Sequence, residues 1–176
     1  MAGKVVLYIA STLDGYIATE DGGIDWLTSY DGGNHGYEDL MERTGALAMG
    51  SGTFDFFESV ETWPYPEQTS WVFTSKELDK GKFEDSDIRA VSGPPAESMA
   101  KIVESAGGKD IWLLGGGVLL AEFLKAGLVD EIIHFLAPKA LSSGIPMFTE
   151  PVLDAFRMDE VKLHPEGMIE LHYRPA

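Results

Sequence analysis

Three consecutive glycines, Gly115, Gly116 and Gly117, constrain this chain more than any other feature of its sequence. They separate an apolar run, 111–114, that predicts a strand from an amphipathic segment, 118–126, that predicts a helix. Glycine has no Cβ, so a ligand can approach its main chain closely, and the free N–H groups at the start of a helix favour an anion. The junction predicts a phosphate-binding turn; the alternative is a strand–helix turn with no ligand.

A second junction of the same kind follows the apolar run 46–49. The segment Gly50-Ser51-Gly52-Thr53 stands there, before apolar residues at helical spacing. In open α/β sheets, ligands bind outside the carboxyl ends of the strands, so the two junctions could flank one cofactor. Neither junction has the Gly-x-Gly-x-x-Gly pattern of dinucleotide-binding domains, which argues against a Rossmann domain.

Strand-like and helix-like segments alternate along most of the chain. The expected strands are 5–10, 46–49, 70–75, 88–91, 111–114 and 129–137, and the expected helices include 35–44 and 118–126. This order predicts an α/β fold with a mostly parallel central sheet flanked by helices. Segments 161–163 and 168–173 predict an antiparallel C-terminal hairpin at the edge of the sheet. A length of 176 residues suits a single domain, 1–176.

The formal net charge of −16 argues against a nucleic-acid partner, because such a surface repels polyanions. No apolar stretch is long enough to span a bilayer, so we expect no membrane partner. The first apolar run stops at Ser11 and predicts a strand rather than a cleaved signal, which favours a cytoplasmic location. The four histidines, His35, His134, His164 and His172, lack the spacing of a helical metal pair, and we expect no metal site.

Taken together, these pieces resemble the dihydrofolate reductase-like superfamily. The matching segments are 9–18, 24–27, 49–54, 72–75, 111–117 and 128–132. The resemblance is closest to the branch that contains the reductase domain of the riboflavin-biosynthesis deaminase-reductase, its C-terminal domain, and that domain's stand-alone relatives. It implies an oxidoreductase that transfers hydride from NADPH to a small planar substrate, either pterin-like or pyrimidine-like.

The resemblance also implies which residues hold the cofactor. These are Ala10, Gly50, Ser51, Thr53, Ser75, Lys76, Gly115, Gly116, Gly117 and Val118. Thr53 would offer its hydroxyl to a phosphate or, alternatively, cap a helix. Ser75 and Lys76 would lie near the adenosine 2′-phosphate, or form a solvated strand end. Many relatives have arginine at the position of Ser51, so NADH stays possible. The family often has a cis peptide between Gly115 and Gly116.

Asp14 is the first candidate for the proton source, since the family places an aspartate of this segment at the active site. Its alternative role is an Asx turn before Gly15. Trp26, Ser29 and Tyr37 are the expected substrate-binding residues.

A second function stays open at this stage. The chain could be a nucleotide-binding or dimerisation module that retains the fold without the chemistry. A homodimer is plausible from the family branch and from the apolar strand 132–137.

Overall fold

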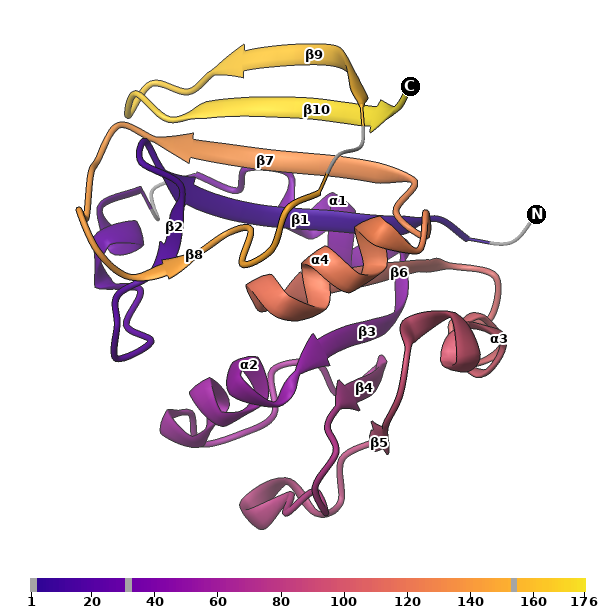
Figure 1. Cartoon of the computed structure of the whole chain (residues 1–176). Coiled ribbons are helices and arrows are strands. Elements are labelled where there is room, and N and C mark those ends of the chain that lie inside the picture. Colours follow the sequence, from indigo (N-terminus) through magenta and orange to yellow (C-terminus); the bar gives the residue numbers. More distant parts are fainter. Residues whose placement is uncertain (1–2, 31–32, 153–154) are drawn as a thin grey trace.

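The computed structural model describes residues 3–30, 33–152 and 155–176. Its centre is an eight-stranded sheet in the order β5-β4-β3-β6-β1-β7-β10-β9 (Figure 1). The strands are β1 (Val5–Thr12), β3 (Thr44–Gly50), β4 (Thr69–Phe73), β5 (Ile88–Val91), β6 (Asp110–Gly115), β7 (Glu131–Ala137), β9 (Phe156–Leu163) and β10 (Ile169–Pro175). The pairings from β5 across to β7 are parallel, and β10 and β9 are added antiparallel.

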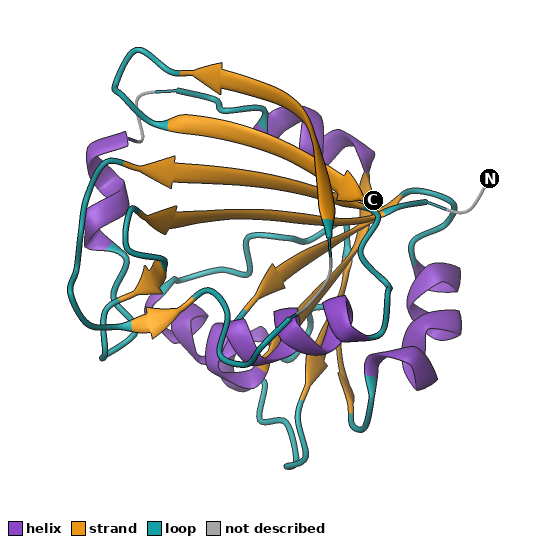
Figure 2. Ribbon diagram, turned by 45° about the horizontal axis from the view of Figure 1, so that its top comes forward, coloured by secondary structure: helices purple, strands orange, loops and turns teal. Residues whose placement is uncertain are grey.

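Helices cover both faces of this sheet (Figure 2). The α-helices are α1 (Tyr37–Arg43), α2 (Ser51–Phe56), α3 (Pro95–Ser105) and α4 (Gly117–Lys125), and short 3-10 helices span Asp25–Tyr30, Phe57–Ser59 and Gly81–Phe83. A separate two-stranded sheet pairs β2 (Tyr16–Ala18) with β8 (Ile145–Pro146). The observed architecture confirms the predicted α/β fold, with its mostly parallel sheet and its C-terminal hairpin.

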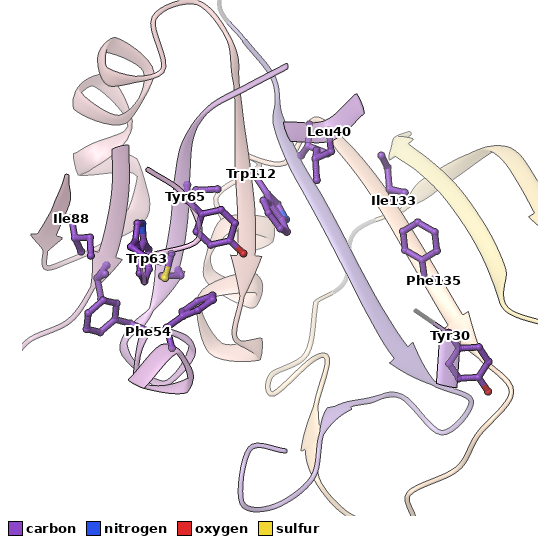
Figure 3. Close-up of a cluster of buried hydrophobic side chains, with 14 of the residues drawn as sticks. Tyr30, Leu40, Phe54, Trp63, Tyr65, Ile88, Trp112, Ile133 and Phe135 are labelled. Atoms are coloured by element: carbon purple, nitrogen blue, oxygen red, sulfur yellow. The ribbon is translucent and has the colours of Figure 1, made fainter. Parts of the chain in front are cut away.

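The sheet separates two apolar cores because successive side chains of a strand point to opposite faces. On β1, Val5, Leu7 and Ile9 pack in the core that contains residues of α3 and α4. Val6 joins the other core, under α1, where the aromatic residues gather (Figure 3). A strand buried on both faces reads as a continuous apolar run, which is why β1 was recognisable in the sequence.

Three details differ from the expectations. Strands β2 and β8 were not predicted, because strands of three and two residues are too short to show a period. The strand 132–137, which suggested a dimer, is internal: β7 lies between β1 and β10, and Ile132, Ile133 and Phe135 are buried. It therefore offers no free edge to a second copy. Among the described residues, no helix is both long and apolar enough to cross a membrane.

His134 on β7 makes stability depend on pH. Its Nε2 lies 2.7 Å from the Ser11 hydroxyl, and burial lowers its pKa from 6.5 to about 4. Because the folded-state pKa is depressed, the unfolded chain takes up the proton first as the pH falls below the ordinary value. We expect this histidine to lower the free energy of unfolding by up to about 2 kcal/mol between about pH 7 and pH 5.

Urea denaturation of the wild type and of His134→Gln at both pH values measures this effect. The carboxylates titrate in both proteins and cancel in the comparison, and glutamine retains a hydrogen-bonding group toward Ser11. The variant should lose less stability than the wild type on acidification. Equal losses in the two proteins would contradict the assignment.

Candidate functional site

A cavity of about 1540 Å³ lies at the carboxyl ends of the parallel strands. Its lining includes Ala10 of β1, Gly50 of β3 and the residues that follow β4 and β6. In open α/β sheets, ligands bind outside the carboxyl ends of the strands. They bind at the switch point, where successive connections lead to strands on opposite sides. The strands therefore supply a rigid floor, and the turns that leave them supply the functional groups.

The two glycine junctions meet at this floor. Pairing of β3 with β6 sets Met49 opposite Gly115. A Cβ added to Gly50 would lie 3.9 Å from the carbonyl oxygen of Gly115 and 3.9 Å from the nitrogen of Gly116. The Gly115–Gly116 peptide is cis, as the family resemblance predicted. The two turns thus form one continuous main-chain surface.

Both helices that leave the junctions begin without a side-chain cap. Gly50 precedes α2 and Gly116 precedes α4, and among the described residues neither helix start has a side-chain cap hydrogen bond. Uncapped N–H groups at a helix start are suited to an anion. Thr53 lies in the first turn of α2 and lines the cavity, and among the described residues its hydroxyl has no hydrogen-bond partner. The helix-capping alternative for Thr53 is not realised.

The cavity continues past α2 to the end of β4, where Ser75 and Lys76 line it. Lys76 is the only lysine or arginine among the described residues of the lining. The lining carboxylates are Glu38, Asp55, Glu58, Glu77, Asp79 and Glu122. An anionic ligand at this end would depend on main-chain N–H groups, hydroxyls and a single ammonium group.

Aromatic side chains form the opposite end. The ring of Trp112 on β6 makes edge-on contacts with the rings of Tyr8 at 5.9 Å, Tyr37 at 5.9 Å and Tyr65 at 5.7 Å, and Phe135 lies 4.9 Å from Tyr8. Figure 3 shows Tyr65 beside Trp112. Burial raises the pKa of all three tyrosines, so their hydroxyls stay protonated at neutral pH. This end can hold a flat ring and offer it hydrogen bonds.

Most of the residues expected to bind the cofactor come together in the lining. They are Ala10, Gly50, Ser51, Thr53, Ser75, Lys76, Gly116, Gly117 and Val118; Gly115 lies directly behind them as the last residue of β6. Of the expected substrate residues, Trp26 and Tyr37 line the cavity. The indole N–H of Trp26 is buried with no acceptor among the described residues.

Asp14 and Ser29 are not part of this lining. The Asp14 carboxylate accepts hydrogen bonds from the Thr12 hydroxyl at 2.6 Å and from the main-chain N–H groups of Leu141 and Ser142. The Thr12 hydrogen bond, followed by those of the two N–H groups, lowers its pKa. Ser29 accepts a hydrogen bond from the Lys139 ammonium at 3.0 Å. Both side chains therefore hold one loop against another. The proton-donor role of Asp14 stays a prediction, and this geometry does not favour it.

Sequence reasoning did not select Tyr8, Tyr65, Trp112 or Phe135 as site residues. Three of them lie in strands, where alternation could have shown which residues share a face. Whether Tyr65 lies beside these three residues depends on how its loop packs over the sheet. This loop follows the 3-10 helix Phe57–Ser59. That packing leaves no periodic signal in the sequence.

Comparison with known proteins places this geometry in a family. The sequence profile of the RibD C-terminal domain matches residues 63–169. The chain belongs to the RibD C-terminal domain family. It is 33% identical to the protein YwjB of Bacillus subtilis (strain 168), itself uncharacterised, over 98% of each chain. The family resemblance inferred from the sequence motifs is therefore confirmed.

Solved structures support the same placement. A Shewanella sp. PV-4 protein provisionally named for riboflavin biosynthesis superposes with a TM-score of 0.86 at 28% identity, over 98% of this chain and 99% of that one. Dihydrofolate reductase from Enterococcus faecalis superposes with a TM-score of 0.73 at 17% identity, over 99% and 98% of the two chains. The second likeness concerns the fold alone. This RibD C-terminal domain protein thus has a dihydrofolate reductase-like fold in a family with reductase members.

Gly117 controls how closely α4 packs on the strand that closes the cavity. A Cβ at this position would lie 2.6 Å from the carbonyl oxygen of Pro146 and 3.0 Å from the Thr149 methyl group. We expect Gly117→Ala to lower the free energy of unfolding by roughly 1–3 kcal/mol, because main chain must move to make room. Chemical denaturation measures the change.

Gly52→Ala is the matched control. It adds the same methyl group in the first turn of α2, where nothing lies within 4 Å of the added Cβ. Alanine stabilises a helix relative to glycine, so this variant should be as stable as the wild type or more stable. Equal destabilisation by the two substitutions would refute the packing argument.

Proposed function

We propose that this chain is an NADPH-dependent reductase that transfers hydride to a small planar substrate of pterin or pyrimidine type. The observation that carries the proposal is the single cavity that joins two uncapped glycine–helix starts to an aromatic end. One end suits phosphate groups and the other suits a flat ring. A reductase of this kind has to hold both in one space.

The residues of the glycine end fit a nicotinamide dinucleotide. The turn before α4 and the Thr53 hydroxyl would bind the pyrophosphate, and Ser75 with Lys76 would bind the adenosine 2′-phosphate. The matching Enterococcus faecalis dihydrofolate reductase was solved in complex with NADP(H), which supports this assignment through the shared fold. When bound, the cofactor would supply the hydride. The protein's part is to orient donor and acceptor and to exclude water.

The aromatic end indicates the substrate class. Its rings suit a planar heterocycle, and the protonated hydroxyls of Tyr37 and Tyr65 can donate hydrogen bonds to ring oxygens or nitrogens. Glu38 at the start of α1 lines the cavity as an acceptor and is held by the Asn34 amide at 2.8 Å. No lysine or arginine among the described lining residues belongs to this end, so the substrate's ring, rather than a phosphate, should supply most of the recognition.

Calorimetric titration with NADPH and NADH, followed by NADPH oxidation against dihydropterins, aminopyrimidines and simple carbonyl compounds, tests the proposal. Micromolar binding of a nicotinamide cofactor and turnover of a planar substrate are expected. Tight binding without turnover of any compound would favour the non-catalytic nucleotide-binding module. If neither cofactor binds below the millimolar range, both the reductase hypothesis and the nucleotide-binding-module hypothesis are wrong.

Val118 tests where the phosphates bind. It is 58% exposed, lies in the first turn of α4 and lines the cavity. We expect Val118→Glu to weaken NADPH binding about tenfold or more, equivalent to about 1.4 kcal/mol, since a carboxylate there repels the pyrophosphate. Val161→Glu is the control, because Val161 is 55% exposed on β9 and outside the cavity lining. Equal effects of the two variants on NADPH binding would show that the pyrophosphate does not bind beside Val118.

Lys76 tests cofactor choice. Among the described residues, no carboxylate lies within ion-pair distance of its ammonium group. We expect Lys76→Ala to weaken NADPH binding by about three- to tenfold and to leave NADH unchanged, as removal of one point charge would predict. Ser51→Arg should act in the opposite direction and raise the preference for NADPH. Titration of each variant with both cofactors measures the ratio; an unchanged ratio would refute the 2′-phosphate assignment.

A further inference from the structure

Three side chains from two distant segments of the sequence meet beside the aromatic end of the cavity. His35 precedes α1, and His164 and Glu166 lie in the turn between β9 and β10. One possible ligand atom from each lies within 4.8 Å of the others. His35 Nε2 is 3.0 Å from Glu166 Oε1, and the two imidazole rings are 4.6 Å apart.

This cluster contains polar atoms that lack a partner. His35 Nδ1 is buried and has no hydrogen-bond partner among the described residues, and buried Glu166 Oε1 accepts no hydrogen bond there and has only the ion-pair contact with His35 Nε2. The His35 side chain is only 10% exposed. Its Nε2 also lies 2.9 Å from the Tyr30 carbonyl oxygen. Buried acceptors without a donor are costly, and a bound cation would remove that cost at the acceptor atom that it contacts.

Glu170 orients the second histidine. Its Oε2 is 2.7 Å from His164 Nε2, and Glu170 is itself buried and held by Lys162 and His172. When an imidazole donates one ring N–H to a carboxylate, the other nitrogen keeps its lone pair. This is the arrangement that most metal-binding histidines use. The same contact both fixes the ring and makes it a better ligand.

We propose that His35, His164 and Glu166 bind one divalent cation of the zinc class. Two imidazoles and one carboxylate form a ligand set that suits zinc, whereas calcium and magnesium require mostly oxygen ligands. With bonds of about 2.0–2.2 Å, ligand atoms on a tetrahedral zinc ion stand roughly 3.3 Å apart. The three candidate ligand atoms lie within 4.8 Å of one another, so binding would have to draw them closer by up to about 1.5 Å.

The site would connect the cavity wall to the C-terminal hairpin. His35 lines the cavity, as do its neighbours Phe135 and Met168, while the other two ligands belong to the β9–β10 turn. An ion would therefore hold the segment before α1 against this turn and fix one wall of the aromatic end. The proposal does not depend on the reductase function, because it concerns binding of the ion alone.

Calorimetry with zinc chloride on chelator-treated protein tests the site, and cobalt(II) provides a spectroscopic probe of the coordination geometry. We expect one ion per chain at micromolar or lower dissociation constant, with the intense visible absorption of tetrahedral cobalt. His164→Asn and Glu166→Gln should each weaken zinc binding about 100-fold or more. His172→Asn is the matched control: it removes another histidine bound to Glu170 and should change the affinity by less than about tenfold.

A readout on the wild type guards against variants that fail to fold. In imidazole nitrogen spectra, zinc should shift the signals of His35 and His164 and leave those of His134 and His172 in place. Absence of saturable zinc binding would overturn the proposal and leave His35 and Glu166 as an ion pair. Binding that survives both ligand substitutions, or that shifts the other two histidines instead, would overturn it as well.

Discussion

The parallel pairing of β3 with β6 is the constraint on which the site depends. Ala48 lies opposite Leu113 and Met49 lies opposite Gly115, so β6 contains one more residue than β3 at this point. Such an irregularity redirects the chain at the end of a strand. It brings the turn before α4 beside the turn before α2 and leaves main chain, rather than side chains, at the floor of the cavity. The meeting of the two glycine turns at the floor of the cavity follows from this one pairing.

Charge limits what this floor can bind. The chain carries a formal net charge of −16, and among the described residues six carboxylates line the cavity against one lysine. Long-range attraction therefore cannot bring an anionic ligand to the site. For the proposed cofactor, binding would have to come from short-range contacts with N–H groups and hydroxyls, which would recognise the pyrophosphate shared by NADH and NADPH. Discrimination between the two would then depend on the few groups near Ser51 and Lys76.

The sequence predicted the parts of the fold that leave a local signal. Apolar runs gave the strands, and glycines before amphipathic segments marked both junctions. Contacts between distant segments left no such signal. Asp14 was selected for its motif, yet its carboxylate binds N–H groups more than 120 residues away at Leu141 and Ser142. His35 and His164 showed no metal spacing because the loop before α1 and the β9–β10 turn meet only in the folded chain.

The two ends of the cavity are held together by different means. Strands β1, β3 and β6 support the glycine end directly, whereas the aromatic end also depends on residues from the segments between the strands, such as Trp26, His35 and Tyr65. Long-range contacts hold those loops: Lys139 donates to the Trp26 carbonyl at 3.2 Å, and Tyr8 donates to the His35 carbonyl at 3.1 Å. Loops tolerate sequence change better than the strands they connect. In the proposed reductase, the hydride donor would therefore keep one position while substrate choice varies with these loops, and Asp14 and Ser29 would influence that choice by fixing the loops.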